Sequence, residues 1–107
     1  MRQGKVYIDH VLTGLIREDE EGYHFQYEIV YLQSKNARAV SRTLPLRKQT
    51  YSSETLHAFF DGLIPEGWLL DIARTNWKIS TRDRMGLLLT LCRDCIGNVS
   101  VIEDENL

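Results

Sequence analysis

Pro65 divides this chain into two halves that carry different sequence patterns. Proline disfavours helical geometry at the residue before it, so the helix expected around Phe59 should end at Ile64. The residues before this helix have the patterns of strands, and the residues after it have those of helices and one closing strand. We therefore expect an α+β fold, in which a small, mostly antiparallel sheet has two to three helices packed on one face.

Length and charge narrow the class of protein. A chain of 107 residues is expected to form one domain, spanning residues 1–107. Its formal net charge of −2 gives no long-range electrostatic reason to expect nucleic acid. No apolar run reaches the roughly 20 residues that span a bilayer, and the N-terminus lacks the apolar segment of a signal peptide. We expect a cytoplasmic protein with reduced cysteines and no membrane partner.

Period-two patterns and β-branched residues predict the strands. The expected strands are residues 5–9, 10–17, 23–32, 39–46 and 98–102. A bulge is expected at Gly14, and the four acids and one glycine of residues 18–22 mark a hairpin loop. The clearest strand is the third, because aromatic and apolar residues alternate there with mostly polar ones. Its predicted buried face consists of Tyr23, Phe25, Tyr27, Ile29 and Tyr31.

Amphipathic patterns predict the helices. Ser52 or Ser53 is expected to cap the first helix, and a second is expected at about residues 66–77. Ser80 and Asp83 have the spacing of a capping box, which predicts a third helix that starts at this serine. The helical region is about residues 53–93, and its apolar stripes are Leu56, Phe59, Phe60 and Leu63, then Leu69, Ile72, Ala73 and Trp77, then Met85, Leu88, Leu89 and Cys92.

No pattern in the chain predicts catalysis or a cofactor. The sequence lacks a dinucleotide-binding glycine motif, a phosphate-binding loop, an H-E-x-x-H motif and a G-x-S-x-G elbow. Cys92 and Cys95 form a C-x-x-C pair at a helix C-terminus, where a thiolate is disfavoured, and no second pair completes a zinc site. Asp61 and Glu66 could act as an acid–base pair, although capping is the commoner role. We expect no enzyme activity, no metal and no small-molecule ligand.

Three surface features allow both a functional and a purely structural interpretation. The acidic residues 18–22 could form a docking patch, but solvated turns are the usual fate of such runs. The cations between Arg38 and Lys48 could bind phosphate, or they could keep an edge strand from pairing with other chains. Trp68, near the tip of the predicted helix–loop–helix corner, could either cover the core or anchor a partner.

Several motifs give the chain a resemblance to a known family. They are the helix end Phe59-Phe60-Asp61-Gly62-Leu63-Ile64-Pro65-Glu66, the segment Gly86-Leu87-Leu88, and the corner Arg93-Asp94-Cys95-Ile96-Gly97-Asn98-Val99. Together they resemble the N-terminal subdomain of the HipA toxin kinases, which carries an FFDNLLP helix end and a G-x-D-x-x-G-A-V corner. The resemblance extends from the first strand to Ile102. The chain departs from the corner motif at Cys92 and Asn98, where the family has glycine and alanine.

The resemblance implies a function through protein contacts. The chain ends at Leu107, before the kinase body that follows this subdomain in HipA, and so resembles the free-standing form found in three-component HipBST systems. In those systems the small component neutralises the serine/threonine kinase toxin HipT, and HipB supplies the helix-turn-helix contact with DNA. The resemblance thus implies an antitoxin that binds a HipT-like kinase toxin, in a ternary complex with a HipB-like protein and with DNA reached only through that protein.

The predicted corner supplies the expected partner-binding residues. We expect the segment from Ile64 to Trp68 to insert at or near the kinase active site, because a domain without chemistry of its own can inhibit by occupying a cleft. The alternative is a structural subunit that bridges the kinase to the DNA-binding protein without inhibiting it. The predicted partner-binding residues are Asp61, Ile64, Pro65, Glu66, Gly67 and Trp68.

Overall fold

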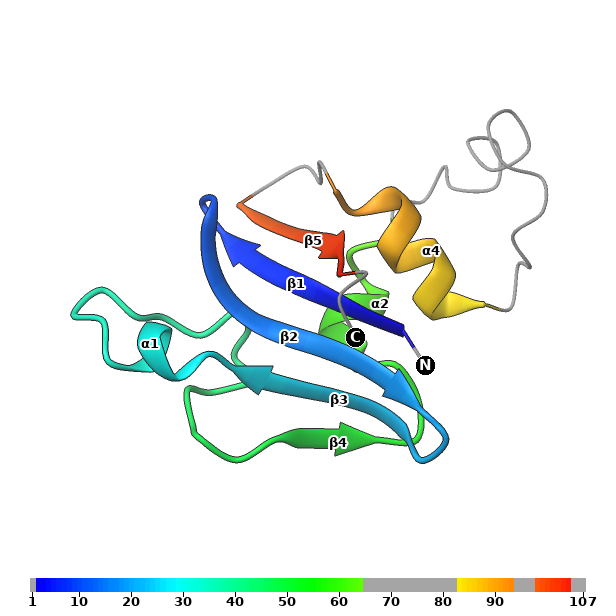
Figure 1. The fold of residues 1–107 in the computed structure, drawn as a ribbon, viewed down its shortest axis with the longest axis horizontal. Helices are drawn as coiled ribbons and strands as arrows, with labels where there is room; N and C mark the ends of the chain where they lie inside the picture. The colour runs from blue at the N-terminus through cyan, green and yellow to red at the C-terminus, as the bar shows by residue number, and fades with distance from the viewer. Residues whose placement is uncertain (1, 65–82, 94–97, 105–107) are drawn as a thin grey trace.

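One five-stranded antiparallel sheet forms the body of the protein. The computed structural model describes residues 2–64, 83–93 and 98–104, and the strand order in them is β4-β3-β2-β1-β5 (Figure 1). The strands are β1 (Arg2–Ile8), β2 (Val11–Asp19), β3 (Gly22–Tyr27), β4 (Tyr51–Ser53) and β5 (Val99–Glu103). The helices of the described residues are α1 (Ile29–Leu32), α2 (Ala58–Asp61) and α4 (Arg84–Leu91). The predicted α+β class is therefore confirmed.

Helices α2 and α4 pack on the same face of the sheet. Gly4, Ile16 and Phe25 are cross-strand neighbours in β1, β2 and β3, so they share this face. A Cβ atom on Gly4 would lie 2.8 Å from a methyl carbon of Leu89, which shows how closely α4 approaches β1. The ring of Phe25 lies 5.2 Å from that of Phe60 in α2. This covered face holds the core, and the opposite face has neither of these helices on it.

The buried side chains of the covered face form one apolar cluster. Its members on α4 and at the C-cap of this helix are those predicted from the helical spacing, which are Met85, Leu88, Leu89 and Cys92. Cys92 is fully buried, so its interpretation as a small core residue is confirmed. The other members of the cluster are Val6, Ile8, Ile16, Phe25, Tyr27, Tyr31, Val40, Leu44, Leu56, Phe60, Val99 and Val101.

The first hairpin confirms two predicted strands and shifts their boundary. Asp9 and His10, each assigned to a strand from the sequence, form the two-residue turn, and both have positive φ, as a type I′ hairpin turn requires. The predicted bulge is present one residue earlier than expected. Val6 pairs with Gly14 and the next residue of β1 pairs with Leu12, so the extra residue is Thr13.

The strand predicted at 23–32 is wrong beyond Tyr27. The peptide N–H of Glu28 donates to the carbonyl of Thr13 (2.8 Å), and the chain then turns into α1 instead of continuing the ladder. Ile29, predicted to be buried, is 58% exposed. Tyr31 remains buried because the helical turn brings its ring back onto Tyr27, with centroids 6.4 Å apart. Glu28, which is the N-cap of α1, and the four residues of α1 therefore occupy the last five positions of the predicted strand.

The strand predicted at 39–46 is also wrong. Among the described residues, this segment makes only an isolated bridge between Ser41 and Leu44. The Tyr27 hydroxyl accepts from the Val40 N–H (3.0 Å) and donates to the Leu44 carbonyl, so a side chain satisfies backbone groups that a strand partner would otherwise use. The strand beside β3 is instead β4, residues 51–53.

The predicted helix caps need correction. Ser52 and Ser53 lie in β4, and α2 begins after His57, whose side chain makes no capping bond. Asp83 is the N-cap of α4 itself, because its carboxylate accepts from the Gly86 N–H (3.1 Å). The predicted helix at 66–77 and Ser80 lie outside the described residues. The hairpin loop at 18–22 and the closing strand are confirmed as β2–β3 and β5.

Candidate partner-binding site

The structure describes the base of the predicted corner. Asp61 is the last residue of α2, and Ile64 lies three residues later, at the end of the turn that follows this helix. Pro65, Glu66, Gly67 and Trp68 lie outside the described residues, so their role as a partner-binding surface stays a prediction. What the structure adds is how the two ends of the intervening segment, at Ile64 and Asp83, are held.

The first end is held by an apolar contact with α4. Ile64 is 7% exposed and packs with the fully buried Leu87 and the partly buried Leu91, in a cluster separate from the main core. Burial of an aliphatic side chain of this size contributes roughly 1.5 to 3 kcal/mol. Ile64 therefore anchors the chain end and leaves little of its own side chain for a partner.

An ion pair supports the same junction. Asp61 Oδ1 accepts a hydrogen bond from Arg84 Nε at 2.6 Å, which joins the last residue of α2 to the first of α4. Both side chains are a third or more exposed, so this pair contributes at most about 1 kcal/mol. The carboxylate of Asp61 is thus occupied in joining two helices, which supports a structural role over acid–base catalysis.

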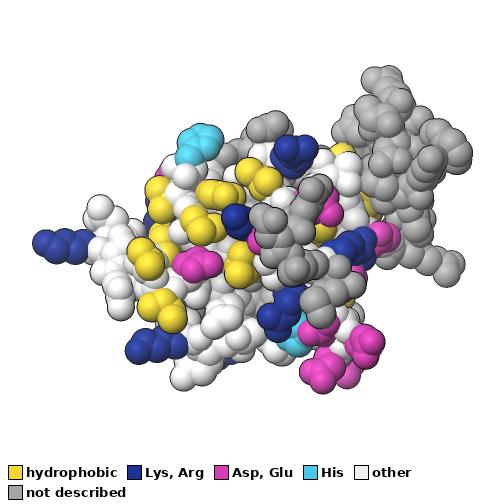
Figure 2. Space-filling model, in the orientation of Figure 1, with side chains coloured by type: hydrophobic (Ala, Val, Ile, Leu, Met, Phe, Trp, Pro, Cys, Tyr) yellow, Lys and Arg dark blue, Asp and Glu magenta, His cyan; other side chains and the backbone are white. Residues whose placement is uncertain are grey.

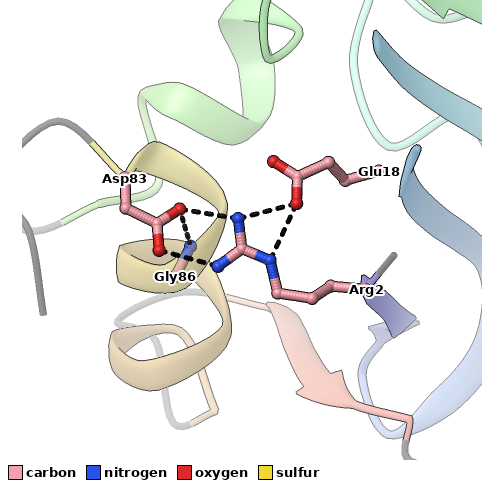
Figure 3. A network of polar contacts seen from close by, with 4 residues as sticks. All are labelled: Arg2, Glu18, Asp83 and Gly86. Carbon is pink, nitrogen blue, oxygen red and sulfur yellow. Dashed lines mark hydrogen bonds and ion pairs between the residues drawn. The ribbon is translucent and has the colours of Figure 1, made fainter. Parts of the chain in front are cut away.

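The second end is held by a three-residue polar network that the sequence analysis did not anticipate (Figure 3). Arg2 donates from Nη1 and Nη2 to the two carboxylate oxygens of Asp83, each at 2.7 Å. Its Nε donates to Glu18 Oε1, also at 2.7 Å. Bidentate guanidinium–carboxylate pairs have a fixed geometry. The network therefore ties the start of α4 to β1 and β2 and sets where the chain enters α4.

The network also lowers the pKa of the Asp83 carboxyl group. The Arg2 hydrogen bond holds the pKa of Asp83 below its ordinary value, and the Gly86 N–H adds to this effect, while partial burial opposes it. No sequence pattern marked Arg2, because the residue lies 81 positions from its partner and outside any motif.

Acidification is expected to remove the contribution of this network. Because the folded pKa of Asp83 is below 3.8, the contact stabilises the fold above about pH 4 and is lost as the pH falls through the folded value. Asp83→Asn keeps a capping side chain without the charge. It should lower the free energy of unfolding by about 1 kcal/mol at neutral pH, and this difference should be smaller at a pH well below 4.

Urea denaturation at both pH values measures this effect. The matched control is Glu20→Gln, which removes an exposed carboxylate that forms no ion pair with another described residue. A constant deficit of Asp83→Asn across the pH range would show that the loss comes from capping geometry and not from charge.

A serine, a histidine and an aspartate also meet on the sheet. His24 is hydrogen-bonded through Nε2 to Asp19 (2.9 Å) and through Nδ1 to Ser52 (2.8 Å). This contact holds the pKa of Asp19 below its ordinary value. The chain of contacts links the β2–β3 hairpin to the short strand β4, which gives it a structural role. Within the described residues, no group of three or more His, Cys, Asp and Glu side chains is placed to hold a metal ion.

The two charged regions identified from the sequence lie in different parts of the fold. The acidic turn lines an open hollow of about 970 Å³ together with Tyr23 and Glu54. The cations between Arg38 and Lys48 lie in a loop and not on an edge strand, so the interpretation as edge protection is wrong. Arg38 pairs with Asp9, and the guanidinium of Arg47 lies 3.6 Å from the ring centre of Tyr51. No helix of the described residues is long and apolar enough to span a bilayer.

Comparison with known proteins identifies the domain type. Residues 4–102 match the family described as the HipA N-terminal domain. A solved structure of the N-terminal domain of HipA toxin superposes with a TM-score of 0.76 at 30% sequence identity, covering 100% of this chain and 96% of that one. An uncharacterised protein of Haemophilus influenzae is 31% identical over 105 residues, which is 98% of this chain and 95% of the relative.

Proposed function

Because the chain belongs to the HipA N-terminal domain family, we propose that it is an antitoxin of the HipS type, which binds and inhibits a HipA-like serine/threonine kinase toxin. The observation that carries this proposal is the extent of the match. The chain corresponds to nearly all of a domain that another protein, a HipA toxin, carries as its N-terminal part. The family relationship supports a component of a toxin–antitoxin system, and kinase inhibition is the more specific proposal.

A physical argument connects this correspondence to kinase binding. Interfaces between domains of one chain resemble those between separate proteins, so a domain supplied as a separate chain can dock on the body from which it was divided. A kinase of the HipT type, which lacks this subdomain, would offer the matching surface. We propose that binding takes place in the cytoplasm and that a HipB-like protein is the third component, which the same relationship supports.

The proposed inhibitory element is the corner between the two anchored ends. Ile64 is held against Leu87, and Asp83 is held by Arg2, so the residues on either side of segment 65–82, which contains Trp68, are fixed beside α4. Fixed ends reduce the conformational entropy that a loop loses when it binds. Tryptophan is among the residues that contribute most to interfaces. We propose that the corner at residues 64–68 enters or covers the kinase active site, with the buried Ile64 serving as its anchor on α4.

A kinase assay with the purified chain tests the proposal. A HipT-type kinase co-expressed with this chain is expected to co-purify with it and to lose autophosphorylation activity as one equivalent is added. A chain that co-purifies while activity is unchanged would be a structural bridge to the DNA-binding protein. Failure to co-purify with that kinase would overturn the kinase-binding proposal altogether.

A further inference from the structure

The long loop between α1 and β4 concentrates positive charge. Residues 33–50, which we call the basic loop, contain no acidic residue, and their cations are Lys35, Arg38, Arg42, Arg47 and Lys48. All of these residues are exposed. Because they lie outside the strands of the sheet, protection of a strand edge does not account for them.

Most of this charge is not neutralised by the described part of the chain. Among the cations of the basic loop, only Arg38 forms an ion pair there, with Asp9. The guanidinium of Arg47 is held over the ring of Tyr51, 3.6 Å from its centre, and donates to backbone carbonyls two and three residues later in the chain. A guanidinium held in this way has further N–H donors for an anion.

Buried contacts fix the backbone that carries these cations. Val40 and Leu44 belong to the core, and the Tyr27 hydroxyl bonds the N–H of the first and the carbonyl of the second. The Tyr31 hydroxyl accepts from the Arg38 N–H at 3.0 Å and donates to the carbonyl of the same residue at 2.9 Å. A loop that is already ordered loses less conformational entropy when it binds.

The unpaired acids lie at the other end of the molecule. Glu20 and Glu21 belong to the β2–β3 hairpin, and Glu54 lines the same hollow. Figure 2 shows basic side chains at the left, where Figure 1 places α1 and the loop after it, and acidic side chains gathered at the lower right. The net charge of −2 is therefore the sum of a basic loop and an acidic end, and it does not describe either surface.

We propose that the basic loop binds the sugar–phosphate backbone of nucleic acid. Its cations follow one another along the chain from Lys35 to Lys48, which suits a row of phosphates better than a single phosphate. Contacts of this kind position a protein on nucleic acid without reading its sequence. The acidic end would turn away from the polyanion and so orient the chain. The inference is independent of kinase inhibition, and it differs from the expectation that DNA is reached only through a HipB-like protein.

Fluorescence anisotropy of labelled DNA and RNA duplexes at several salt concentrations tests this inference. The native chain is expected to bind at least one of them at low salt, with equal affinity for unrelated sequences. Each phosphate contact changes the slope of log affinity against log salt by about −0.9, so the cations without an ion pair predict a slope of about −3 to −4 on a DNA duplex. Binding to neither duplex would overturn the inference. So would binding only to vesicles that contain anionic lipid, which would assign the loop to lipid head groups.

Two double variants separate the loop from overall charge. Arg42→Gln with Lys48→Gln should weaken binding about tenfold or more at low salt and make the salt slope shallower by about two. The matched control is Lys5→Gln with Arg17→Gln, which removes the same charge from β1 and β2 and should leave the slope unchanged. Equal losses in the two double variants would show that net charge alone governs binding, and would exclude the loop as the site.

Discussion

Phe60→Ala is expected to lower the free energy of unfolding by about 3 to 5 kcal/mol, the range for removing a large buried aromatic side chain. Phe60 is fully buried, and its ring lies 5.2 Å from that of Phe25 on β3. Truncation would leave a cavity where α2 meets the sheet. Because small domains are stable by only about 5 to 15 kcal/mol, this loss should lower the melting temperature by many degrees.

The neighbouring phenylalanine gives a matched control. Phe59 precedes Phe60 in α2 and is only partly buried, so the same substitution should cost about 1 to 2 kcal/mol. Urea denaturation of both variants measures the difference. Equal losses would mean that α2 does not present one face to the sheet as the structure places it.

Trp68→Ala is expected to weaken kinase inhibition by about 2 kcal/mol or more, a factor of roughly 30 in the inhibition constant. The reason is the proposed position of the indole on a segment whose ends are fixed beside α4, where it would fill a pocket of the kinase. Because the ends are held by Ile64 and Asp83, the free energy of unfolding should change little. Titration of kinase activity with the variant, together with its thermal unfolding, measures both quantities.

Two further variants separate binding from folding. Leu46→Ala truncates an exposed apolar side chain in the loop before β4 and should alter neither quantity. Ile64→Ala removes the buried anchor and should lower stability and inhibition together, by about 2 to 5 kcal/mol in stability. Trp68→Ala that inhibits as well as the native chain would show that the corner does not contribute to inhibition. A large loss of stability would assign the indole to the core.

The elements that the sequence predicted correctly are those with uniform local patterns. The spacing of Met85, Leu88, Leu89 and Cys92 identified the buried side of α4, and all four are buried. The hairpin at 18–22 followed from its acids and glycine. A helix stripe depends on neighbours three or four residues away, and a hairpin loop depends on the conformations that a few residues can adopt. Both can therefore be predicted from a short stretch of sequence.

The elements predicted wrongly depend on distant contacts. The period-two pattern continued through Tyr31, but β3 ends at Tyr27, where the N–H of Glu28 donates to the carbonyl of Thr13 and the chain turns into α1. The segment 39–46 had strand composition, yet the Tyr27 hydroxyl bonds its backbone instead of a neighbouring strand. In both places a long-range contact overrode a local preference of similar strength.

The candidate site divides in the same way. Pro65 marked the predicted corner, but α2 ends at Asp61, three residues before the predicted end at Ile64, and Asp83, not Ser80, is the N-cap of α4. The bidentate contact of Arg2 with Asp83 could not be predicted, because the two residues are 81 positions apart. Their proximity depends on β1 lying beside α4.

The sequence by itself determined the α+β class and the family, since both depend on residue patterns and motifs that can be recognised without coordinates. Only the tertiary structure decided which residues hold Ile64 and Asp83 in place and which face of the sheet stays open. These contacts form between strands and helices that are far apart in the chain. Their free energy depends on how those elements pack, which a pattern within one short stretch of sequence does not specify.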